Sequence, residues 1–173
     1  NLHIEPSENN VRLDLISVNN DGDGMVVHSV LFNGNKVPYT HKNNELNIST
    51  DGLKYSIYDV ITIEYSGIPI TGLIIGDNMH GDRTFFSDNW PNKARNWLPL
   101  VDHPYDKSTS EFIVFAPNHY QVISNGLLVE ETNVNKDIKK THGTQSVPIS
   151  CWLSAFGVEE FAIDYVDFFY GKS

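Results

Sequence analysis

The sequence predicts an all-β domain of antiparallel strands, and three observations indicate it. Short stretches alternate apolar and polar residues, turn-forming residues separate these stretches, and no long window keeps apolar residues at helical spacing. Hydrophobic residues make up 40% of the 173 residues and aromatic residues 12%, which is typical of a globular chain with a core. At this length we expect one sandwich-like domain over residues 1–173.

Five alternating stretches in the first half of the chain are expected to be strands: residues 11–15, 30–32, 36–39, 46–48 and 61–65. Asn33 and Gly34 separate the second stretch from the third. Both residue types accept positive φ, so a hairpin is predicted at that point. Residues 19–24 consist of Asn, Asp and Gly, which indicates a turn.

Three more strands are expected in the second half of the chain: residues 112–115, 120–123 and 127–129. Asn125 and Gly126 form the turn between the last two. Residues 131–147 are polar and rich in lysine, which predicts a mobile hairpin tip. The aromatic tail from Cys151 to Tyr170 is rich in β-branched residues and interrupted by Gly157, so it favours strand over helix.

The charge of the chain excludes some classes of partner. Asp and Glu number 22 against 12 Lys and Arg, so the net charge is −10, which repels phosphate backbones and anionic lipid. We therefore expect no nucleic-acid partner, and no apolar run is long enough for a membrane span. A cationic ligand such as a free peptide amine is favoured. The chain begins at Asn1, which suggests a fragment or processed chain, and the compartment stays open with export slightly favoured.

Motifs for metal binding or nucleophilic catalysis are absent from the sequence. Residues 19–24 match the start of a calcium loop, but Val30 stands where that loop needs a bidentate glutamate. None of the seven histidines is followed by glutamate, so the zinc motif H-E-x-x-H does not occur. Cys151, the one cysteine, lies in an apolar stretch where a buried thiol is inert. We expect no metal site in this chain.

Residues 87–108 hold the most unusual composition, with two tryptophans, three prolines and three aspartates. Asp102, two residues before a proline, suits a turn in which its carboxylate accepts N–H groups. Arg95 offers five donors, and Trp90 and Trp97 supply apolar area that would anchor a loop on a sheet. From these residues alone, the segment is either a braced structural loop or a ligand surface.

The same segment resembles the signature A-R-x-x-x-P-x-x-D-x-P-x-x-K of the aminopeptidase N family of zinc metallopeptidases. The matching residues are Arg95, Pro99, Asp102, Pro104 and Lys107. Further segments continue the resemblance in order: residues 65–69 resemble Y-x-G-x-P, residues 120–126 resemble Y-x-x-x-S-N-G and residues 152–156 resemble Y-L-x-A-F. Colinearity over residues 11–165 is more specific than any single motif.

The resemblance implies the N-terminal domain of such an enzyme, an antiparallel saddle-like β-sandwich that packs on a catalytic domain. The first strands of that domain are expected to be short or missing here. The catalytic domain of the same polypeptide would bind zinc and hydrolyse peptide substrates, so this chain alone is expected to hold no cofactor and to be inactive.

In the family, the loop before the A-R motif carries a glutamine or glutamate that holds the free amine of the substrate. In the family this residue belongs to a Q-x-E/Q pair. By register, the two positions of that pair fall on Asp88 and Trp90. Either Asp88 or Asn89 supplies the acceptor, or Trp90 lines the first specificity pocket as an apolar wall. The resemblance thus implies that residues 88–90 face the substrate and that the five signature residues brace the loop.

A different class of function stays open, namely a free-standing β-sandwich module that binds carbohydrate or protein. Exposure of both Trp90 and Trp97 on a flat face would favour this alternative.

Overall fold

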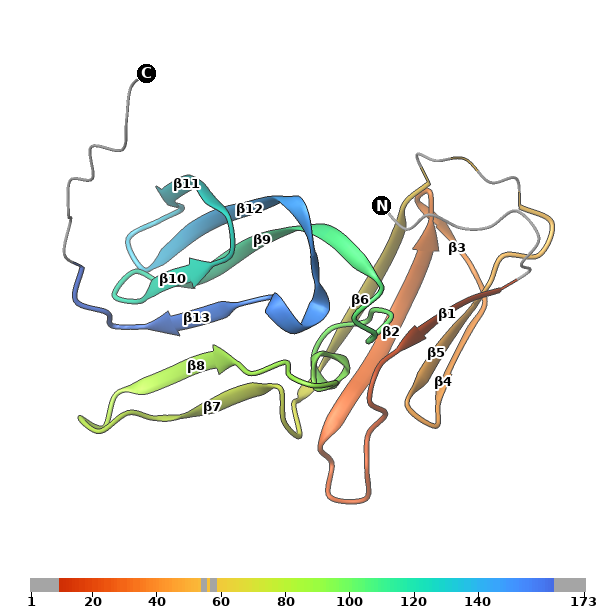
Figure 1. Ribbon diagram of the computed structural model, residues 1–173, viewed down its shortest axis with the longest axis horizontal. Coiled ribbons are helices and arrows are strands. Elements are labelled where there is room, and N and C mark those ends of the chain that lie inside the picture. The colour runs from red at the N-terminus through yellow and green to blue at the C-terminus, as the bar shows by residue number, and fades with distance from the viewer. Residues whose placement is uncertain (1–9, 54–55, 57–58, 164–173) are drawn as a thin grey trace.

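The computed structural model describes residues 10–53, 56 and 59–163, and its regular structure there consists of strands and two short 3-10 helices (Figure 1). Every pairing between two of its strands is antiparallel. The prediction of an all-β antiparallel fold is confirmed. Within the described ranges, no helix is long and apolar enough to cross a membrane.

The first half of the chain forms two three-stranded sheets. One sheet has the order β1-β5-β4 and the other the order β3-β2-β6. The strands are β1 (Asn10–Asp14), β2 (Gly24–Phe32), β3 (Asn35–Lys36), β4 (Tyr39–Lys42), β5 (Glu45–Ser49) and β6 (Ile61–Ile68). Alternate side chains of these strands point inward and build the main core, because successive residues of a strand face opposite sides. The buried members include Val11, Leu13, Val27, Val30, Leu46 and Ile48.

The second half forms a three-stranded sheet of order β11-β12-β9 and a four-stranded sheet of order β10-β13-β8-β7. The strands are β7 (Leu73–Asp77), β8 (Arg83–Ser87), β9 (Lys107–Pro117), β10 (Gln121–Ser124), β11 (Leu127–Asn133), β12 (Ile138–Ser150) and β13 (Phe156–Glu159). The 3-10 helices are η1 (Ala94–Asn96) and η2 (Cys151–Leu153). In Figure 1 the two halves lie side by side, and the segment that carries η1 lies between them.

Most local predictions agree with this fold. Asn33 and Gly34 adopt positive φ values of 48° and 80° and join β2 to β3 as the predicted hairpin. Residues 61–65 lie in β6 with alternating burial, as expected. Strands β7 and β8 were not predicted, because their residues show no regular alternation of apolar and polar side chains.

Residues 131–147 belong to a hairpin, as predicted, but most of them lie in its strands rather than in its tip. β11 continues to Asn133 and β12 runs from Ile138 to Ser150 as the central strand of its sheet. Lys139 is buried because its ammonium pairs with Glu131 at 3.4 Å and donates to Gln121 at 3.2 Å. A lysine-rich stretch can therefore form a central strand when its charges find partners on neighbouring strands.

Candidate functional site

The segment of residues 88–106 connects β8 to β9 and contains four of the five signature residues, and Lys107 follows it at the start of β9. At its start, the backbone N–H of Asp88 donates to the carbonyl of Gly72 at 2.8 Å, which attaches the loop to the start of β7. Gly72 has a φ of +80°, and a Cβ at this position would lie 2.2 Å from the carbonyl oxygen of Lys93. Only glycine allows this close approach of two backbone segments.

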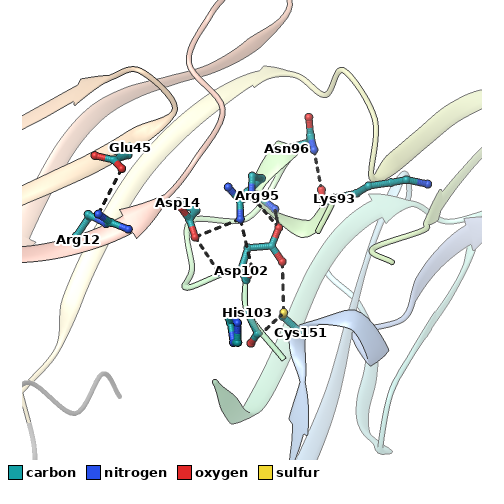
Figure 2. A network of polar contacts seen from close by, with 9 residues as sticks. All are labelled: Arg12, Asp14, Glu45, Lys93, Arg95, Asn96, Asp102, His103 and Cys151. Carbon is teal, nitrogen blue, oxygen red and sulfur yellow. Dashed lines mark hydrogen bonds and ion pairs between the residues drawn. The ribbon is translucent and has the colours of Figure 1, made fainter. Parts of the chain in front are cut away.

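Arg95 and Asp102 form the centre of the loop (Figure 2). The Oδ2 atom of Asp102 accepts from the Arg95 backbone N–H at 3.3 Å and from Arg95 Nε at 3.0 Å. Arg95 Nη2 also donates to the Asp102 carbonyl at 3.3 Å. The Asp102 side chain is 0% exposed, so its charge depends on these donors.

Asp14 at the end of β1 ties this centre to the first half of the fold. Its Oδ2 accepts from the Asp102 backbone N–H at 3.0 Å and lies 3.5 Å from Arg95 Nη2. Backbone bonds also run from Asp14 N–H to the Leu100 carbonyl at 2.7 Å and from Ile16 N–H to the Arg95 carbonyl at 2.9 Å. The loop is therefore hydrogen-bonded to β1 and to the residues that follow it.

Cys151 connects the same carboxylate to η2. Its thiol donates to Asp102 Oδ1 at 3.4 Å, and the sulfur lies 3.8 Å from the His103 carbonyl. Burial, followed by the hydrogen bond to Asp102, raises the pKa of the Cys151 thiol from 9.0 to about 11. The thiol therefore stays protonated at neutral pH and acts as a structural donor, in agreement with the expected inert cysteine.

Asn89 is the buried anchor of the loop start, with 3% of its surface exposed. Its Nδ2 donates to the Ser154 carbonyl at 2.7 Å and to the Cys151 carbonyl at 3.4 Å. Its Oδ1 accepts from the indole N–H of Trp97 at 2.9 Å. The side-chain amide of this residue, which was expected to face the substrate, thus bonds within the fold.

Trp97 is part of the hydrophobic core. Its ring stacks on Phe112 at 6.3 Å between centroids and lies 5.8 Å from the ring of Phe156. The hydroxyl of Tyr65 donates to the Trp97 carbonyl at 2.8 Å, and burial raises the pKa of this tyrosine. The large apolar side chain of Trp97 thus fixes the loop between the two halves of the fold.

The residues on either side of Asn89 are exposed. Together with Lys93 they form a surface that we call the loop tip. Trp90 is 63% exposed and is followed by a cis peptide bond to Pro91. The Asp88 side chain is 47% exposed and accepts from the Lys93 ammonium at 2.5 Å. The tip therefore presents one apolar ring and one pair of opposite charges to its surroundings.

The remaining signature residues are Pro99, Pro104 and Lys107. Pro99 and Pro104 are half-buried, and Lys107 is exposed at the first position of β9. Sequence reasoning missed Asp14, because it looked like an outward-facing strand residue. It also missed the role of Cys151, which looked like an apolar core residue. No local pattern distinguishes these two residues.

A metal site is not supported by the side chains of the described part of the chain. No group of three or more His, Cys, Asp or Glu residues converges there. In the calcium-like turn, Asn19 Oδ1 accepts from the backbone N–H groups of Asp21 and Asp23 at 2.9 and 3.0 Å. This asparagine closes the turn by itself, and the residues present do not fit zinc.

The chain is similar in sequence to part of the mammalian glutamyl aminopeptidases. Rat (Rattus norvegicus) glutamyl aminopeptidase is 33% identical over 75 residues, which are 43% of this chain and 8% of that protein. The human (Homo sapiens) glutamyl aminopeptidase is 28% identical over 109 residues, which are 59% of this chain and 11% of that protein. The matched segments thus span about a tenth of the length of these relatives.

The fold is shared with a solved structure, the M1 zinc metallopeptidase from Deinococcus radiodurans. The TM-score is 0.73 at 23% identity, and the match covers 87% of this chain and 34% of that chain. The model of the Peptidase M1 N-terminal domain matches residues 6–153. This chain belongs to the Peptidase M1 N-terminal domain family.

Proposed function

We propose that this chain is the non-catalytic N-terminal domain of a zinc aminopeptidase that removes single residues from the amino ends of peptides. The zinc and the catalytic residues belong to a catalytic domain elsewhere in the same polypeptide, on which this domain packs. The family membership and the lack of a metal cluster in the described ranges support this division of roles. The contribution of this domain is to shape the site that receives the substrate amine and first side chain.

The arrangement around Asn89 is the observation that carries the proposal. Asn89 is anchored by hydrogen bonds on both sides of its amide, so its exposed neighbours Asp88 and Trp90 are held in fixed positions. A preorganised acceptor next to an apolar ring suits a first pocket, because little ordering is needed when substrate binds. Asp88 would hold the substrate amine and Trp90 would contact the first side chain.

The Asp88–Lys93 pair suggests which first residue is preferred. An N-terminal glutamate or aspartate carries an ammonium and a side-chain carboxylate, the same two charges that Lys93 and Asp88 present to each other at 2.5 Å. The substrate ammonium can replace Lys93 on Asp88, and the substrate carboxylate can replace Asp88 on Lys93. The names of the mammalian relatives, glutamyl aminopeptidases, are in line with an acidic first residue.

Activity of the full-length protein tests the proposal. Reporter substrates with glutamyl, leucyl and arginyl groups should be cleaved by the full-length protein, and a zinc chelator should abolish cleavage. Residues 1–173 alone should be inactive. A full-length protein without chelator-sensitive cleavage would refute the proposal and favour a free-standing binding module. Of the two tryptophans that such a module would display, Trp90 is exposed, but Trp97 is in the core.

Variants of the tip separate the individual roles in the full-length protein. Asp88→Asn should raise KM for every substrate, because each one carries the amine. Lys93→Gln should lower kcat/KM for the glutamyl substrate by about tenfold relative to the leucyl substrate. Lys93→Arg is the matched control and should keep the preference for glutamyl. An unchanged ratio in Lys93→Gln would rule out the role of Lys93.

A further inference from the structure

β7 is the outer strand of the four-stranded sheet. It pairs with β8 on one side, and no described strand lies on its other side. Exposed edges of this kind are usually protected by lysine, proline or a bulge. Residues 73–77 read Leu-Ile-Ile-Gly-Asp, and the register between β7 and β8 has no irregularity. The edge therefore has no lysine, proline or bulge against pairing with another strand, and its one charged residue is Asp77 at its end.

The hydrogen bond between Asp88 and Gly72 determines which backbone N–H and C=O groups of β7 point away from β8. The Asp88 N–H donates to the Gly72 carbonyl, so these two residues form a hydrogen-bonded antiparallel pair next to the pair of Leu73 and Ser87. Hydrogen-bonded and non-bonded pairs alternate along an antiparallel ladder. The β7 residues whose N–H and C=O groups point outward are therefore Leu73, Ile75 and Asp77.

A groove of about 500 Å³ lies along the first part of this edge and along residues 67–71, which lead into β7. Its lining includes Leu73, Ile74 and Ile75, consecutive residues whose side chains point to opposite faces of the sheet. A groove that touches all three follows the edge of the strand rather than one face. Ile68 and Ile70 also line it, and the isoleucines of the groove are 38% to 60% exposed.

The groove has one charged side chain, Arg83, at its far end. The guanidinium of Arg83 lies 5.7 Å from the ring centroid of Phe85, which orients it. In a chain with a net charge of −10, a cation beside an apolar groove favours a partner that is apolar and carries an acidic residue. Gly72, to which Asp88 of the loop tip is bonded, directly precedes Leu73 of the groove.

We propose that β7 is a docking edge for an extended strand of the catalytic domain, which adds to the sheet by main-chain hydrogen bonds. The inference rests on the proposed function. The relatives have further chain that could supply such a strand, since the match covers 34% of the solved metallopeptidase and about a tenth of the mammalian enzymes. The partner strand places apolar side chains in the groove and an acidic residue near Arg83. Because Gly72 links β7 to Asp88, docking also sets the position of the loop tip at the substrate cleft.

Amide hydrogen exchange at residue resolution in the full-length protein tests this pairing. The amides of Leu73, Ile75 and Asp77 should exchange more slowly than unstructured amides by about a hundredfold or more. The amides of Ile74 and Gly76, which bond to β8, serve as internal references for protection. Rapid exchange at the three outward amides beside protected references would overturn the proposal.

Two further measurements identify the occupant of the edge. Protection that appears only as the protein dimerises at high concentration would assign the edge to a second copy and overturn the proposal. Protection that is lost when residues 164–173 are deleted, in an otherwise folded protein, would assign it to that segment and would also overturn the proposal. Protection that persists in a monomer and after this deletion supports docking of the catalytic domain.

A proline variant of β7 tests the main-chain pairing, and an activity measurement separates it from the proposed function. Ile75→Pro removes an outward N–H and leaves the ladder to β8 intact, because Ile75 does not bond inward. It should raise exchange at Leu73 and Asp77 at least about tenfold while Ile74 stays protected, and the control Ile75→Val should not. Aminopeptidase activity of the unsubstituted full-length protein is measured on the same samples that are used for its amide exchange. An active enzyme with an unprotected edge refutes only the docking, and an inactive protein with a protected edge refutes the proposed function.

Discussion

The carboxylate of Asp102 is fully buried and accepts both the backbone N–H and the Nε of Arg95, seven positions earlier in the chain. This pair is the point at which the loop, β1 and η2 meet, since Asp14 and Cys151 bond to the same aspartate. A buried charge of this kind is stable only while its donors remain. The signature residues Arg95 and Asp102 thus hold the loop on which Asp88 and Trp90 stand.

Loss of the Arg95 side chain should destabilise the domain more than loss of the Asp88 side chain. Arg95→Ala leaves the Asp102 carboxylate buried with fewer donors, which costs about 3 kcal/mol and lowers Tm by roughly 6–12 °C. Asp88→Ala removes an exposed ion pair and should change stability by less than about 1 kcal/mol. Thermal unfolding followed by circular dichroism measures both, and equal small losses would contradict the assignment of Arg95 as a brace.

Replacement of Asn89 should also destabilise the domain. Asn89→Ala leaves the buried indole N–H of Trp97 without its acceptor and removes one of the two donors to the Ser154 carbonyl, which keeps Ser87 Oγ, at a cost of about 2–3 kcal/mol. Asn92 is exposed on the same loop and provides the control, because Asn92→Ala should change stability by less than about 0.5 kcal/mol. Urea denaturation reports the difference, and equal midpoints for the two variants would argue against the buried anchor.

Two glycines, Gly72 just before β7 and Gly76 within it, should respond differently to replacement by alanine. Gly72→Ala places a methyl group 2.2 Å from the Lys93 carbonyl at a φ of +80°, which should cost about 2–4 kcal/mol. Gly76 has no atom within 4 Å of the added Cβ, so Gly76→Ala should be neutral within about 0.5 kcal/mol. Chemical denaturation of the two variants checks this, and tolerance of Gly72→Ala would mean that the loop does not need the close approach.

The raised pKa of Cys151 predicts a loss of stability at alkaline pH. Unfolding returns the thiol pKa from about 11 to 9.0, so above pH 9 the unfolded chain binds fewer protons than the folded chain. Stability from this group is complete below pH 9 and is lost as pH rises to 11, by about 2–3 kcal/mol in total. Cys151→Ser keeps a donor for Asp102 and does not titrate. The free energy of unfolding should therefore fall less steeply in this variant between pH 9 and pH 11, and parallel curves would contradict the role of the thiol.

Local patterns predicted much of the fold. The strands at residues 11–15 and 61–65 and the hairpin at Asn33-Gly34 depend on residues that lie next to each other in the chain. The extent of the strands within residues 131–147, which was not predicted, has the opposite origin. Lys139 is a strand residue because Glu131 and Gln121 on neighbouring strands neutralise and bond its ammonium, and its own neighbours in sequence carry no sign of this.

The sequence by itself determined the all-β class, the main turns and membership of the family, since these follow from periodicity and from motifs that occur in order. Only the tertiary structure decided which residues hold the candidate site. Asp14 is 88 positions from Asp102, and Cys151 is 49 positions from it. Hydrogen bonds over such separations form only when the sheets have packed, so no short stretch of sequence contains them.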